Sequence, residues 1–152
     1  MTRSQARQMG DFNARFLLDS LKAAHASLLA AIDELGGLTK QPLPQAQLLI
    51  NVRWNVSKAS LDRRLLWGRI HLELSRRVDS GSEAALRRLQ DIDMQLLQSS
   101  SAHVTKWTPD AIQKDWAGYC RASAEIRRKM VEAIEAETSL LYPILTSLAQ
   151  SA

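Results

Sequence analysis

Apolar residues recur at alternating steps of three and four along four long segments of this chain. This periodicity restricts the fold more than any other feature of the sequence. The apolar stripes run over residues 18–35, 52–70, 86–107 and 112–140. Residues at this spacing share one face of an α-helix, so each segment is predicted to be a helix with one buried face. Aromatic residues make up only 5% of the chain, and six glycines and four prolines occur in 152 residues. This scarcity of β-formers and turn formers also favours long helices.

Three short interruptions separate these segments. They are Gly36–Gly37 with the prolines that follow, the stretch 79–82, and Thr108-Pro109-Asp110. We therefore predict helices over about 11–35 and 45–78, a third from after residue 82 to about 106, and a fourth from about 109 to 148. Short connections join antiparallel neighbours, so the expected fold is an all-α, up-down-up-down four-helix bundle. Residues 1–10 are expected to form a flexible N-terminal tail, and residues 11–149 a single domain.

Charge and composition argue against several functional classes. The net charge is +4, but the basic residues occur in scattered pairs among acidic ones, which is typical of solvated helix surfaces and not of a nucleic-acid site. No apolar run approaches the ~20 residues of a membrane span, and residues 1–10 lack the apolar segment of a signal peptide. Cys120 is the only cysteine, so we expect no internal disulfide and a cytoplasmic location. No phosphate-binding loop or catalytic triad is found, so no enzymatic activity is predicted.

Each apolar stripe contains at least one polar residue, and four of these fall at similar heights. They are His25, Arg63, Asp93 and Glu137, one on each predicted helix. With a rise of ~1.5 Å per residue, the four lie within about one helical turn of the same level. A charge in an apolar interior must have a partner. We therefore predict that an imidazole, a guanidinium and two carboxylates meet near the middle of the bundle.

This polar layer has two interpretations. Histidine and carboxylates that project inward from facing helices can bind a metal, and the ligands would then be His25, Asp93 and Glu137. Alternatively, the four side chains neutralise one another as a buried ion network. Arg63 favours the second interpretation, because its permanent charge repels a metal dication and its guanidinium can satisfy the carboxylates itself. The sequence therefore favours an ion network without a bound metal.

Three stretches of the sequence resemble the hemerythrin-like (HHE cation-binding) family. Residues 24–29, Ala-His-Ala-Ser-Leu-Leu, resemble the family's first-helix histidine and the leucines that follow it. Lys106-Trp107 and residues 111–119 resemble the junction between its third and fourth helices. Residues 137–145 resemble its closing acid followed by Leu-Tyr-Pro. The resemblance covers residues 16–145 and implies a four-helix bundle that holds a non-haem iron pair.

Residue by residue, the resemblance carries over only part of the iron site. His25 matches the first-helix ligand and Glu137 the acid of the last helix. Ala133 stands where the resemblance implies a histidine, four residues before that acid. The second-helix ligand positions fall near Leu66 and Ile70, which are apolar. The expected protein is therefore a degenerate member that has lost its di-iron site.

Two functions are consistent with this interpretation. The favoured one is a binding, regulatory or structural module without a cofactor. The alternative is an iron-binding hemerythrin-like protein that senses oxygen or nitric oxide or handles iron. The alternative would use His25 and Glu137 with Asp93, His71 or Glu73 as further ligands.

The second helix carries an additional apolar line outside its core stripe. The line consists of Ile50, Trp54, Leu61, Leu65 and Leu72. A helix with so wide an apolar arc is covered on more than one side. The line is either a broad core face of a long helix or an interface for a homodimer or protein partner, with arginines as its polar rim.

Overall fold

The computed structural model describes residues 3–77 and 80–151, with side chains described for 14–77 and 82–151. The predicted all-α class is confirmed, and these residues contain no strand. The helices are α1 (Arg3–Leu38), α2 (Ala46–Ser75), α3 (Ser80–Lys106), α4 (Pro109–Lys114) and α5 (Trp116–Gln150). In the described part of the chain, no helix is both long enough and apolar enough to span a membrane.

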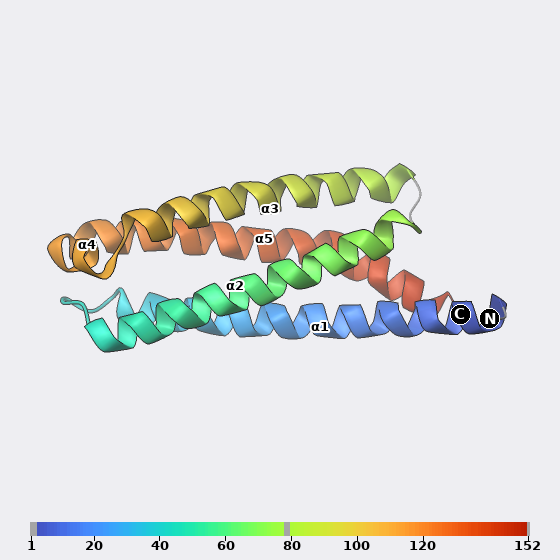
Figure 1. The fold of residues 1–152 in the computed structure, drawn as a ribbon, viewed down its shortest axis with the longest axis horizontal. Coiled ribbons are helices and arrows are strands. Elements are labelled where there is room, and N and C mark those ends of the chain that lie inside the picture. The colour runs from blue at the N-terminus through green and yellow to red at the C-terminus, as the bar shows by residue number, and fades with distance from the viewer. Residues whose placement is uncertain (1–2, 78–79, 152) are drawn as a thin grey trace.

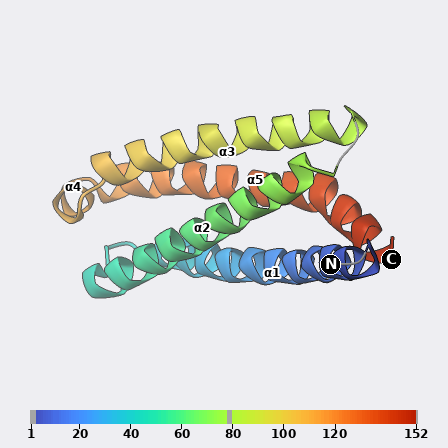
Figure 2. The ribbon, with the colours of Figure 1, turned by 45° about the vertical axis from the view of Figure 1, so that its right-hand side comes forward.

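The four long helices lie along a common direction, and helices that follow one another in the chain run in opposite senses (Figure 1). The short α4 lies at one end, between α3 and α5. Both views show α2 crossing obliquely, from beside α1 at its start toward α3 and α5 at its end (Figure 2). At the end occupied by α4, α2 and α3 are consequently far apart.

Both ends of α1 differ from the prediction. The helix begins at Arg3, within the segment where a tail was expected, and it continues three residues beyond Leu35. Gly36 and Gly37 do not end it, because no described glycine adopts a positive φ. The helix is closed instead at Thr39, whose backbone N–H donates to Leu35 O at 3.1 Å and whose hydroxyl donates to Gly36 O at 2.9 Å.

The prediction of one continuous helix from residue 109 to 148 was wrong. The backbone leaves the helical region at Asp115, with φ −145° and ψ 71°, and this separates α4 from α5. Asp115 then caps α5, since its Oδ1 accepts from Gly118 N at 2.9 Å. A Cβ on residue 118 would lie 2.2 Å from Asp115 Oδ2, so this cap requires glycine there. Aspartate competes with the helix for backbone N–H groups, which is why it interrupts the helix here.

The apolar core has two parts, one toward each end of the molecule. One part lies near α4 and the other near the chain termini, and the levels of His25, Arg63, Asp93 and Glu137 fall between them. The part near α4 includes Leu28, Ile32, Val52, Val56, Leu96, Trp107, Ile112, Tyr119, Ile126 and Met130. The part near the termini includes Leu17, Leu18, Leu21, Trp67, Ile70, Leu74, Leu86, Leu89, Leu141 and Leu145.

The end of α5 bends toward α1, as both views show. Pro143 lies inside the helix there. Proline lacks the N–H that would bond the carbonyl of residue 139, and its ring crowds that carbonyl, so it is the usual cause of such a bend. The bend lets Leu141 and Leu145 complete the core part near the termini.

The additional apolar line on α2 is not a core face. Trp54, Leu61, Leu65 and Leu72 are 46–63% exposed, and Ile50 is 47% exposed. None of these side chains is buried by the described residues, so the interpretation as a broad core face was wrong. The line remains an apolar surface open to a partner.

Replacing Asp115 by Ala should lower the free energy of unfolding by about 1 kcal/mol, because Gly118 N loses its acceptor. Chemical denaturation followed by circular dichroism measures this change. Asp62→Ala is the control, since Asp62 makes only an exposed ion pair with Lys58 at 3.6 Å. This control should lower the free energy of unfolding by less than about 0.5 kcal/mol. Equal losses in the two variants would contradict a capping role for Asp115.

Candidate functional site

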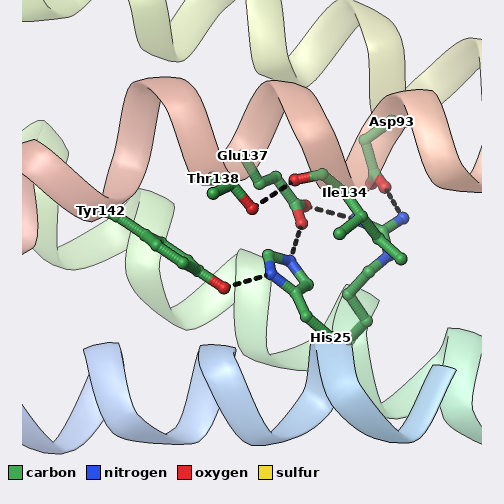
Figure 3. Close-up of polar contacts among 7 residues, drawn as sticks. His25, Asp93, Ile134, Glu137, Thr138 and Tyr142 are labelled. Atoms are coloured by element: carbon green, nitrogen blue, oxygen red, sulfur yellow. Dashed lines mark hydrogen bonds and ion pairs between the residues drawn. The ribbon is translucent and has the colours of Figure 1, made fainter. Parts of the chain in front are cut away.

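The structure brings together the four polar side chains singled out in the sequence. His25 comes from α1, Asp93 from α3 and Glu137 from α5 (Figure 3). Arg63 comes from α2. His25, Arg63 and Glu137 are each only 3% exposed, and the Asp93 side chain is 14% exposed. We call this group the Arg63 network.

Glu137 is held from both sides. Its Oε1 accepts a hydrogen bond from Arg63 Nη1, and its Oε2 lies 2.5 Å from His25 Nε2. Arg63 Nη2 donates to Asp93 Oδ1 at 2.7 Å. One guanidinium therefore bridges carboxylates from two helices, a geometry for which arginine is suited because its donors form a planar fork.

The orientation of His25 follows from its neighbours. An ionised carboxylate only accepts hydrogen bonds, so His25 Nε2 carries the hydrogen that it donates to Glu137. On the other side of the ring, Nδ1 lies 2.6 Å from the hydroxyl of Tyr142. Figure 3 shows the imidazole between these two groups. Both ring nitrogens of His25 are thus engaged.

Tyr142 belongs to the Arg63 network, although it was not predicted as a site residue. It lies five residues after Glu137, off the apolar stripe, so helical periodicity gives no signal for it. Burial raises the pKa of Tyr142, and the Glu137 carboxylate raises it further, whereas a hydrogen bond with Thr138 lowers it. The phenol therefore keeps its proton at neutral pH, and its hydroxyl lies within hydrogen-bond distance of His25 Nδ1.

The residues present do not fit the di-iron centre that the resemblance implies. Arg63 occupies one oxygen of each carboxylate, and His25 uses both of its nitrogens within the network. Ala133 and Ile70, where the resemblance implies ligands, are buried and apolar. Across the described residues, no three His, Cys, Asp or Glu side chains gather in a metal-binding group.

His71 and Glu73, the further ligands considered from sequence, lie outside the network. The His71 ring packs edge-on against Trp67, with ring centroids 5.4 Å apart. Glu73 forms an ion pair at 3.6 Å with Arg77, which lies just after the end of α2. Both His71 and Glu73 are off the stripe of α2 that faces Glu137.

Comparison of the chain with models of protein families, with curated proteins and with solved structures found no match.

Arg63→Leu should lower the free energy of unfolding by about 3–5 kcal/mol, because it leaves Glu137 and Asp93 without their cation in a buried layer. Urea denaturation measures the loss. The double variant Arg63→Leu/Glu137→Gln should be more stable than Arg63→Leu alone, since it also removes the stranded buried charge.

The matched control is Arg64→Leu. Arg64 adjoins Arg63 in sequence, but none of the described residues forms an ion pair or hydrogen bond with it. The free energy of unfolding of Arg64→Leu should stay within about 0.5 kcal/mol of that of wild type. If Arg63→Leu unfolds at the same urea midpoint as Arg64→Leu, the network is not a buried ionic layer.

Proposed function

We propose that this chain is a hemerythrin-like, up-down-up-down four-helix bundle that has lost its iron and acts as a binding, regulatory or structural module. The observation that carries the proposal is the Arg63 guanidinium between Glu137 and Asp93. It supplies the positive charge that a metal pair would otherwise supply to these carboxylates.

Two features of the structure support this assignment. The alternating direction of the long helices is that of an up-down bundle (Figure 1). The matched residues, His25 and Glu137, lie side by side at mid-height, between the two parts of the apolar core. The fold and the place of the site are thus consistent with the family, whereas the side chains at the site are not those of a di-iron centre.

The alternative is an iron-binding protein of the same family. The contact between His25 and Glu137 favours it, because these two side chains would already be placed as neighbouring ligands. It requires Arg63 to leave the layer, and that movement would take a 3% exposed guanidinium away from two carboxylates. Removing one partner from a buried ion pair is unfavourable, which ranks this alternative second.

Metal analysis distinguishes the two proposals. Protein purified from iron-supplemented cells should contain iron far below one atom per chain, because the described residues offer no free set of metal ligands. Inductively coupled plasma mass spectrometry gives the content, with Asp62→Ala as a folded control for surface-bound iron. Near-stoichiometric iron in wild type that is lost in His25→Ala would overturn the metal-free proposal.

We also propose that the exposed apolar line of α2 pairs with the same line of a second copy. Trp54, Leu61, Leu65 and Leu72 follow one another at steps of seven, four and seven, so they share one face of α2. A Cβ added at Gly68, on the same helix, would meet no atom within 4 Å. An open apolar stripe of this kind suits close helix–helix approach.

Light scattering should therefore give a mass of twice the 17.0 kDa of one chain. Leu61→Glu/Leu65→Glu should give the single-chain mass with unchanged helix content, because a charge in an apolar interface is costly. Met94→Glu, at a residue 54% exposed on α3, should leave the dimer intact. A single-chain mass for wild type would refute self-association.

A further inference from the structure

Toward the α4 end, α2 and α3 diverge (Figures 1 and 2). Residues of α2, α3 and α5 line a cleft there. Its volume is about 620 Å³, within the usual range of small-molecule sites. Tyr119, Ile126 and Met130 of α5 line it, together with residues of α2 and α3. It shares no residue with the Arg63 network.

The charged side chains that line the cleft are all basic. Three arginines line it, Arg53 and Arg64 from α2 and Arg127 from α5, and none of the described lining residues is acidic. His103 also lines it, and its pKa is lowered by burial and by the charge of Arg53, so the ring is neutral at pH 7. The cleft is therefore cationic through its arginines and favours an anion.

A buried hydroxyl group of the cleft, Ser60 Oγ, has no hydrogen-bond partner among the described residues. In the part of the chain whose side chains are described, only three buried side-chain polar atoms lack one: Ser60 Oγ, Tyr119 OH and Arg63 Nε. Of these atoms, only Ser60 Oγ adjoins Arg64, which lies four residues away on the same face of α2. The Tyr119 side chain is fully buried, with its hydroxyl beside Ser123. An unpaired buried hydroxyl is unfavourable, so it indicates a place where a ligand can supply the partner.

The three arginines differ in whether their guanidinium groups already have hydrogen-bond partners. Arg53 donates to Trp107 O at 2.7 Å and lies over the Tyr119 ring, 5.5 Å from its centroid. Arg127 donates to Ser123 and, at 3.1 Å, to the hydroxyl of Thr39. Arg64 has no such partner among the described residues. Its guanidinium fork is thus available for a bidentate contact with a carboxylate.

We propose that this cleft binds a small organic carboxylate with an apolar body, whose carboxylate pairs with the Arg64 guanidinium and the Ser60 hydroxyl. The apolar body packs on Ile126 and Met130 in the floor of the cleft. Carboxylate oxygens accept hydrogen bonds from a guanidinium and from hydroxyl groups at once, which matches the donors present.

This inference deepens the proposed function and rests on it only in taking the chain to be a binding module. The cleft and the Arg63 network are tested by different measurements. Near-stoichiometric iron would refute the metal-free bundle whatever binds in the cleft. Failure of carboxylate binding would refute the cleft site and leave the network unaffected.

Isothermal titration calorimetry with octanoate tests the site. Octanoate should bind saturably at pH 7, and the neutral 1-octanol should bind at least about tenfold more weakly, because a charge-assisted pair is lost. Octylammonium, which has the same chain and the opposite charge, should not bind. No saturable binding of octanoate up to about 10 mM, or equal binding of octanoate and 1-octanol, would overturn the proposal.

Variants locate the binding in the cleft. Arg64→Gln should weaken octanoate about tenfold or more, whereas Arg69→Gln, at an exposed arginine of the same helix, should bind it as wild type does. Ser57→Phe adds bulk at an exposed position that lines the cleft, and it should abolish binding while the thermal midpoint is unchanged. Unchanged affinity in both Arg64→Gln and Ser57→Phe would place the octanoate elsewhere and refute the site.

Discussion

The contact between Arg63 and Glu137 is the constraint on which the rest of this structure depends. Glu137 lies in the core-facing stripe of α5, where an ionised carboxylate needs a cation, and Arg63 supplies it from α2. The same guanidinium reaches Asp93 on α3, and Glu137 reaches His25 on α1. Four helices far apart in sequence are thereby joined through one pair of side chains.

We infer that this network contributes more to the specificity of the fold than to its free energy of unfolding. Desolvation of buried ions offsets much of their mutual attraction, so the net gain in free energy is small. The penalty for mispairing is large, however, because a shift of one helix by a turn would place a charge among leucines. The apolar stripes alone would tolerate such a shift, since each repeats along its helix. We infer that the polar layer fixes the axial register of the four long helices.

The sequence predicted the helical class and the polar layer because both depend on spacing alone. His25, Arg63, Asp93 and Glu137 were found by their place on apolar stripes and by helical rise. Features that depend on local hydrogen bonds were missed: the end of α1 at Thr39 and the break at Asp115 are made by single side chains that compete for backbone groups. Tyr142 and the cleft were missed because they depend on how helices bend and diverge, which periodicity does not encode.

The division of the apolar core also affects how the molecule loses its structure. The two parts are separated by charged and polar side chains, which transmit packing less tightly than continuous leucine contacts do. We infer that the two halves open locally as separate units. They differ in composition, since aromatic rings cluster in the half near α4. A molecule that fills the space between α2 and α3 would slow amide exchange in that half first and leave the half near the termini to fluctuate as before.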